Sequence, residues 1–117
     1  MNIESFYNYC SDLPGTTKEF PFDENTLVFK VMGKMFALTD VETFESINLK
    51  CDPEKALELR IAFDEIKPGY HMNKKHWNTL TTSGSLTDDL IFELIDHSYK
   101  LVVEKLPRKL KEQLESL

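Results

Sequence analysis

A stretch without carboxylates stands out in an otherwise acidic chain. Residues 66–87 contain no Asp or Glu, yet they hold lysines, histidines and large aromatic residues, namely Lys67, Lys74, Lys75, His71, His76, Tyr70 and Trp77. Lysines neutralise phosphates, amides such as those of Asn73 and Asn78 hydrogen-bond to a nucleic-acid backbone or to base edges, and aromatic rings stack on bases. These residue types, interleaved in one stretch, indicate contact with a polyanion.

The charge of the whole chain does not exclude that chemistry. The 117 residues carry 20 acidic and 14 basic side chains, a formal charge of -6. Residues 1–65 hold 13 acids and 6 bases, which leaves 7 acids and 8 bases for residues 66–117. Because salt screens charges beyond about 8 Å at physiological ionic strength, a local basic patch acts on a polyanion despite remote carboxylates.

The same residues also fit a purely structural interpretation. Large aromatic side chains usually bury their area, so Trp77 and Tyr70 would then belong to the core and the lysines to an ordinary solvated loop. Trp77 in particular is expected in the core.

Catalytic and metal-binding patterns are weak. His71 and His76 lie five positions apart, which does not align them on one helix face, and no neighbouring Cys, Asp or Glu completes a zinc set. Cys51 falls on the inward side of an alternating strand, which favours a buried thiol over a nucleophile. The four glycines are scattered singly, so no phosphate-binding glycine loop is present. We therefore expect a protein that is not an enzyme and uses no metal or cofactor.

Apolar periodicity predicts the elements that would position these residues. Strands alternate with a period of two, helices show stripes at 3–4 residue spacing, and Pro and Gly end them. The expected elements, in the order α-β-β-β-α-β-α-α, are a helix over 2–12, a hairpin of strands 27–31 and 34–38 turning at Met32–Gly33, a strand over 45–51, a helix from Asp52–Pro53 to about Asp64, a strand over 76–81, a long helix along 86–102 and a short surface helix after Pro107. Ser85 and Asp88 resemble a capping box for the long helix.

Length and composition predict one domain over residues 1–117. No apolar run approaches the roughly 20 residues of a membrane helix, and the first residues lack a signal-peptide pattern. Cys10 and Cys51 lack framework spacing and are expected as two buried free thiols in a reducing compartment. We expect a monomeric cytoplasmic protein.

Several blocks together resemble the MmcQ/YjbR family. They recur in order along nearly the whole chain and comprise residues 13–17, 20–22, 27–31, 33–37, 48–53, 68–79, 96–99 and 105–107, the longest being Pro68-Gly-Tyr-His-Met-Asn-Lys-Lys-His-Trp-Asn-Thr79. The resemblance implies a compact α+β domain of the CyaY and secretion-chaperone type, with an antiparallel sheet flanked by helices. It also implies a DNA-binding role of the double-wing type.

The residue chemistry and the resemblance coincide at residues 68–79. We predict non-catalytic, weak and salt-sensitive DNA binding through this loop and the hairpin. The expected contact residues are Lys34, Lys67, Tyr70, His71, Asn73, Lys74, Lys75, His76 and Asn78, and Lys30 and Lys50 join them if their outward faces coincide.

Two other functions remain open. One is a protein-interaction module, in which an apolar patch on the sheet or the terminal helix captures a partner chain without nucleic acid. The other is a small-molecule pocket lined by Tyr70, His71, Trp77 and Cys51.

Overall fold

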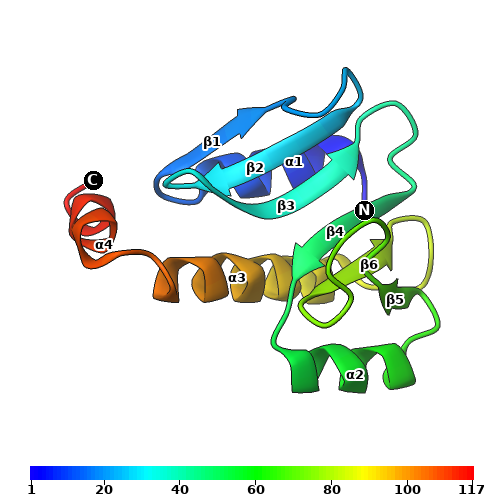
Figure 1. Ribbon diagram of the computed structural model, residues 1–117. Coiled ribbons are helices and arrows are strands. Elements are labelled where there is room, and N and C mark those ends of the chain that lie inside the picture. The colour runs from blue at the N-terminus through cyan, green and yellow to red at the C-terminus, as the bar shows by residue number, and fades with distance from the viewer.

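The computed structural model describes residues 1–117 as one antiparallel sheet and four helices (Figure 1). The elements in chain order are α1 (Ile3–Asp12), β1 (Thr16–Glu19), β2 (Thr26–Val31), β3 (Lys34–Asp40), β4 (Ser46–Lys50), α2 (Pro53–Ala62), β5 (Ile66–Pro68), β6 (Trp77–Thr81), α3 (Asp88–Glu104) and α4 (Arg108–Glu115). This arrangement confirms the predicted α+β class with its antiparallel sheet. No helix combines the length and the apolar character that crossing a membrane requires.

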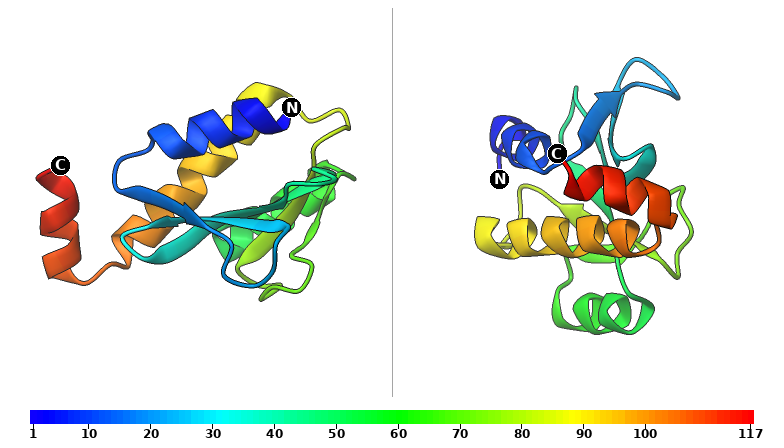
Figure 2. Two further views of the ribbon diagram at one scale, coloured as in Figure 1. Left: turned by 90° about the horizontal axis from the view of Figure 1, so that it is seen from above. Right: turned by 90° about the vertical axis from the view of Figure 1, so that its left-hand side faces the viewer.

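The sheet has the strand order β1-β2-β3-β4-β6-β5, and every neighbouring pair is antiparallel. Helices α1 and α3 lie on the same side of it (Figure 2). Helix α2 packs beside β5, and α4 stands beyond the C-terminal end of α3 (Figure 1). The sequence pattern omits the two edge strands, β1 and β5, so the predicted element order was wrong at these two places.

The main core lies between the sheet and α1 and α3. Phe6 of α1 and Ile95 of α3 are fully buried against inward residues of the strands such as Phe29 and Ile47. Each strand sends alternate side chains to this side, as the period of two predicts. Residues of the opposite side, the open face, form a small second cluster in which Val28, Leu38 and Trp77 pack with Met35 and Met72.

The β2–β3 hairpin turns where the sequence predicts it. Met32 and Gly33 both have positive φ, 49° and 86°. Two successive residues with positive φ are what the tight hairpin turn that matches strand twist requires, and glycine accepts that conformation freely.

The start of α3 differs from the predicted capping box. Thr87 is the N-cap, because its side-chain oxygen accepts a hydrogen bond from the Leu90 N–H at 3.1 Å. Ser85 instead binds the carboxylate of Glu65, and its backbone N–H lies 2.8 Å from Glu65 Oε2. The capping prediction therefore named the wrong residue, because Glu65 from a distant part of the chain holds Ser85.

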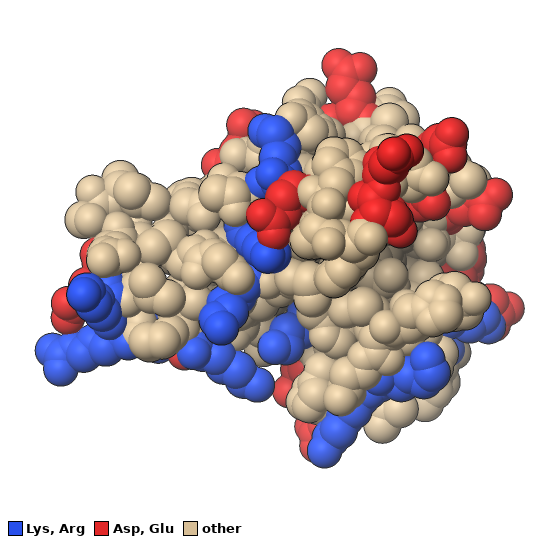
Figure 3. All heavy atoms as spheres, turned by 45° about the horizontal axis from the view of Figure 1, so that its top comes forward, with Lys and Arg blue, Asp and Glu red and all other residues tan.

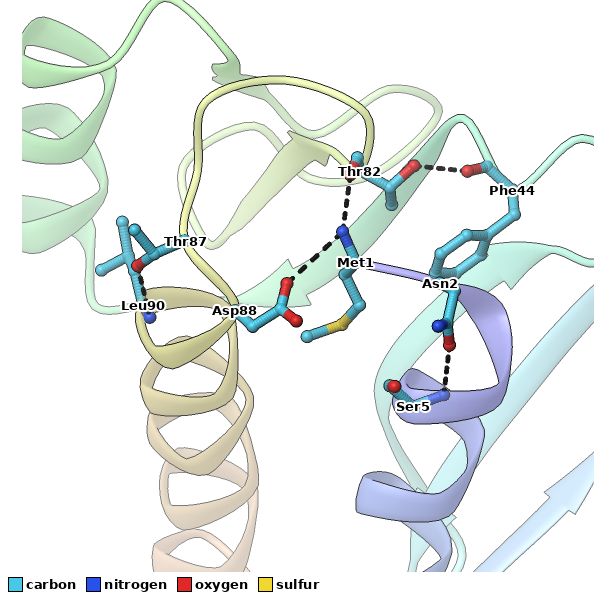
Figure 4. Close-up of polar contacts among 8 residues, drawn as sticks. All are labelled: Met1, Asn2, Ser5, Phe44, Thr82, Thr87, Asp88 and Leu90. Carbon is cyan, nitrogen blue, oxygen red and sulfur yellow. Dashed lines mark hydrogen bonds and ion pairs between the residues drawn. The ribbon is translucent and has the colours of Figure 1, made fainter.

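The N-terminal segment is fixed at the same corner of the molecule (Figure 4). The Met1 ammonium donates to the Thr82 carbonyl at 3.0 Å and lies 3.4 Å from Asp88 Oδ1. Asn2 caps α1 by accepting from the Ser5 N–H at 2.8 Å. The first turns of α1 and α3 are thus tied to the end of β6.

Strands β3 and β4 are joined by a short seam. Only three residue pairs link them, from Ala37–Leu49 to Thr39–Ile47. Beyond the seam, Ser98 of α3 bridges the two strands: its hydroxyl accepts from the Lys50 N–H at 2.9 Å and donates to the Phe36 carbonyl at 2.6 Å. A helix side chain therefore replaces the missing strand pairing.

Candidate functional site

A groove lies where β3 and β4 separate, and we call it the lysine groove. It has a volume of about 250 Å³ and is lined by Lys34, Met35, Lys50, Trp77, Val102 and Lys105. The three lysines come from the start of β3, the end of β4 and the C-terminal end of α3. Distant parts of the sequence thus meet at one place.

The electrostatics of the groove favour an anion. No carboxylate lines it, and none of its three lysines takes part in a salt bridge. Burial, and then the nearby charge of Lys105, hold the pKa of Lys50 below its usual range. Ammonium groups that repel one another are stabilised when an anion enters between them.

The floor of the groove is apolar. Trp77 is 8% exposed and packs with Met35 on the open face. Val102 is buried in the last turn of α3. An apolar floor with cationic walls suits a ligand that combines phosphate with a flat or aliphatic portion.

The predicted contact residues do not converge on one surface. Lys34 lines the groove, and Lys50 joins it. Lys30 instead forms an ion pair with Glu19 on the neighbouring strand. Lys67 is exposed on β5, at the opposite edge of the sheet from β1.

Asn78 is not available as a surface contact, and this part of the prediction was wrong. It is 1% exposed, and its side-chain oxygen accepts from Arg60 Nε at 2.7 Å. On β6 it pairs with Leu49 and points to the core side of the sheet. Its polar side chain thus connects the sheet to α2 through the hydrogen bond with Arg60.

Polar residues of the β5–β6 loop hold the loop itself together. The side-chain oxygen of Asn73 accepts from the backbone N–H groups of Lys75 and His76 at 3.0 and 3.3 Å. The Lys74 ammonium donates to the Gly69 carbonyl at 2.9 Å. His76 is half-buried, whereas Lys75 is exposed.

Tyr70 and His71 occupy the tip of this loop. Both are exposed, and their ring centres are 4.0 Å apart. They line a second, larger cavity on the open face that contains neither Trp77 nor Cys51. The four residues of the predicted small-molecule pocket are therefore not brought together.

The two cysteines are free and buried, as predicted. Burial raises the pKa of the Cys51 thiol to about 11 and raises the pKa of the Cys10 thiol further. A thiol with so high a pKa stays protonated at neutral pH and is a poor nucleophile.

The apolar side chains that an interaction module would need are most exposed on α2. Leu57 and Ile61 lie one helical turn apart and are 57% and 86% exposed. Sequence reasoning placed such a patch on the sheet or the terminal helix instead.

Comparison with known proteins settles the family. The YjbR family model matches residues 11–101, which include the β2–β3 hairpin and the β5–β6 loop. The chain belongs to the YjbR family. The uncharacterized protein YjbR of Escherichia coli K12 is 35% identical over 118 residues, which cover 100% of both chains. The uncharacterized protein YbdF of Escherichia coli O157:H7 is 39% identical over 99 residues, 84% of this chain and 81% of YbdF.

A solved YjbR-like structure has the same fold. The crystal structure of Deinococcus radiodurans protein DR2400, described as a DUF419 domain, superposes with a TM-score of 0.92 at 40% identity. The match covers 97% of this chain and 88% of DR2400. The family and the fold expected from the sequence resemblance are thereby confirmed. The names of these YjbR relatives state no activity, so function has to be argued from the site.

Proposed function

We propose that this chain is a non-enzymatic protein that binds DNA through the lysine groove. The observation that carries the proposal is the convergence of Lys34, Lys50 and Lys105 on one groove that has no carboxylate in its lining. Lysine ammonium groups neutralise phosphates without reading sequence, so they supply affinity and orientation.

The surroundings of the groove support a polyanion rather than a small anion. Lysine and arginine side chains extend as a band across the lower part of the face shown in Figure 3, while acidic side chains gather at its upper right. Outside the groove, the exposed Lys75 of the β5–β6 loop adds a further cation. A phosphate backbone has charges at regular intervals and can follow such a band, whereas a single phosphate would occupy only the groove.

Two projections border the groove. Lys34 follows the tip of the β2–β3 hairpin, and Trp77 follows the β5–β6 loop, which carries the exposed Lys75. A hairpin and a loop on either side of a phosphate-binding groove would act as the two wings that the family resemblance suggests. The proposed contact set is therefore Lys34, Lys50, Lys75 and Lys105.

The proposed setting is the cytoplasm, with the protein acting as a monomer. Two buried free thiols, Cys10 and Cys51, are suited to a reducing compartment. Because their pKa values are raised, these thiols stay protonated at neutral pH, which agrees with a protein that does not use them in catalysis.

The test is a titration of labelled single- and double-stranded oligonucleotides, followed by anisotropy at low salt. Lys34→Ala, Lys50→Ala and Lys105→Ala should each weaken binding about three- to five-fold, the size expected of a solvent-accessible ion pair. Lys100→Ala is the matched control, because Lys100 is exposed on α3 but does not line the groove. Equal losses in the control, or no binding by the unaltered protein, would reject the proposal.

A further inference from the structure

The larger cavity of the open face is a second candidate binding site, separate from the lysine groove. Its volume is about 590 Å³, which lies within the range of pockets for small molecules. Three segments surround it: the β1–β2 loop with Phe22 and Asp23, the β3–β4 connection, and the tip of the β5–β6 loop with Tyr70 and His71. Leu38 and Met72 provide apolar surface within it.

The charge of this cavity is opposite to that of the lysine groove. Asp23, Asp40 and Glu45 line it, and no Lys or Arg does. None of the three carboxylates takes part in a salt bridge. Backbone N–H groups of Thr26 and Asn25 donate to Asp23 and hold the pKa of its carboxyl below the usual range. The carboxylates thus present negative charge without a cationic partner.

A single metal ion does not fit this arrangement. No three His, Cys, Asp or Glu side chains anywhere in the chain are close enough together to hold one. The negative charges are distributed around the cavity, so a ligand that satisfies them has to carry its positive charges at several points.

Aromatic rings complete the chemistry. Phe22 is 64% exposed and Tyr70 is 68% exposed, although burial of such large aromatic side chains is usually favourable. The faces of such rings attract ammonium groups within about 6 Å and also pack against methylene groups. Rings, carboxylates and apolar surface together favour a flexible organic cation over an anion or a neutral sugar.

We propose that this cavity binds a linear polyamine, an alkyl chain with two or more ammonium groups. Its ammonium groups approach Asp23, Asp40 and Glu45, and its methylene segments lie on Leu38 and Met72. Phe22 and Tyr70 close over the chain from opposite loops. The inference does not rest on DNA binding, because the cavity and the lysine groove share no lining residue.

The experiment is isothermal titration calorimetry of the DNA-free protein with spermidine. Putrescine, n-butylamine and butane-1,4-diol serve as probes with two, one and no charges. We expect affinity to fall in that order, with no measurable binding of the diol. Asp40→Asn and Glu45→Gln should each weaken spermidine binding about three- to ten-fold, because each removes one charge partner.

The substitutions are chosen to leave the fold intact. Asp40 Oδ1 accepts from the backbone N–H groups of Glu42 and Thr43, and an asparagine oxygen can accept the same bonds. Glu42→Gln is the matched control, because Glu42 is exposed on the same connection but does not line the cavity. A thermal melt of each variant verifies folding, and Phe22→Ala gives a second, uncharged test of the site.

Each result decides the matter. If Asp40→Asn, Glu45→Gln and Phe22→Ala weaken spermidine binding and Glu42→Gln does not, the result supports a specific polyamine site in this cavity. No spermidine binding at millimolar concentration, equal loss in Glu42→Gln, or binding only of a lysine-rich peptide overturns it. DNA titrations of the same variants should be unchanged, so failure here is distinguishable from failure of the lysine groove.

Discussion

Ser98 shows how one side chain determines the shape of the candidate site. It is fully buried, and its hydroxyl joins Lys50 of β4 to Phe36 of β3 where the strands no longer pair. The lysine groove lies beside this junction, since Lys50 and Met35 belong to its lining. The backbone at Lys50, from which its side chain enters the groove, is thus held by a serine of α3.

Ser98→Ala should therefore lower the free energy of unfolding by about 2 to 4 kcal/mol. The substitution removes the partner of a buried N–H and of a buried carbonyl, and each such loss costs about 1–3 kcal/mol. Urea unfolding measures the change. Ser83→Ala, at an exposed position, is the control and should stay within about 0.5 kcal/mol of the unaltered protein.

His97 makes stability depend on pH. Its Nε2 accepts from the Asp52 N–H at 3.2 Å, which requires a neutral ring. Burial, and then the charge of Lys55, lower the pKa of His97 below 6.5 in the folded protein. Because the unfolded chain then binds the proton more tightly, stability is greatest above pH 6.5 and falls as the pH drops below that value.

His97→Gln should remove this contribution, since glutamine can accept the same bond but does not titrate near pH 6. As the pH falls from 7.5 through 6.5 toward the folded pKa, the unaltered protein should lose unfolding free energy relative to His97→Gln. Chemical unfolding at a series of pH values measures it. If the stability of the unaltered protein minus that of His97→Gln stays constant across this window, or increases on acidification, the role given to His97 is contradicted.

Residue type and sequence context predict some residues of the candidate site and not others. Lys34 was identifiable because it follows an evident hairpin turn. Lys105 was missed because its nearest neighbours in sequence, Glu104 and Leu106, indicate only the end of a helix. Asn78 was misassigned because an amide in a polar stretch resembles a surface residue. Only the partner on α2, Arg60, explains why that amide is buried.

At the scale of elements, α2 fixes the loop that borders the groove. Arg60 donates to the side chain of Asn78 at 2.7 Å, to the Trp77 carbonyl at 3.2 Å and to the Lys74 carbonyl. One guanidinium thus joins a helix to a strand and to the preceding loop. The planar array of five donors makes arginine suited to such a junction.

Arg60→Met should destabilise the protein by about 2 kcal/mol and release the loop, because the buried amide of Asn78 loses its partner. Hydrogen exchange should accelerate most in residues 69–77 and much less in α1. Arg108→Met is the control, because Arg108 is exposed and forms its ion pair with Glu112 of the same helix. Uniform acceleration across the protein would show that Arg60 acts on global stability alone.

The edge strands explain why element prediction was incomplete. Strand β1 is a run of four polar residues, three of them exposed, and β5 has three residues that include Pro68. Neither carries the apolar alternation by which a half-buried strand is identified. Strands β2, β3, β4 and β6 bury alternate or successive side chains, and all four were predicted.

For the whole molecule, the separation of charge matters more than its sum. A net charge of -6 predicts repulsion from DNA, yet basic and acidic side chains occupy different parts of the face in Figure 3. The same separation holds for the two candidate sites, since the lysine groove is lined by lysines without carboxylates and the polyamine cavity by carboxylates without Lys or Arg. The sequence indicated the separation only along the chain, whereas the groove forms by convergence in space.

The salt dependence of DNA binding should reveal this local character. The four proposed contact lysines, three in the groove and Lys75 beside it, predict a slope of about -3 to -4 for log affinity against log salt if each neutralises a phosphate. The triple substitution of Lys34, Lys50 and Lys105 by Ala should reduce the slope to about -1, the share left to Lys75. A slope near zero in the unaltered protein would mean that phosphates are not neutralised at this groove.

The position of Trp77 has a practical consequence. It is the only tryptophan of the chain, it lines the lysine groove, and it belongs to the apolar cluster that also contains Leu38 and Met72 of the polyamine cavity. Its intrinsic fluorescence can therefore report on both sites without an added label. A ligand in the groove would meet the indole directly, whereas one in the cavity would reach it through Leu38 and Met72, so spectral shifts of different size distinguish the two occupancies.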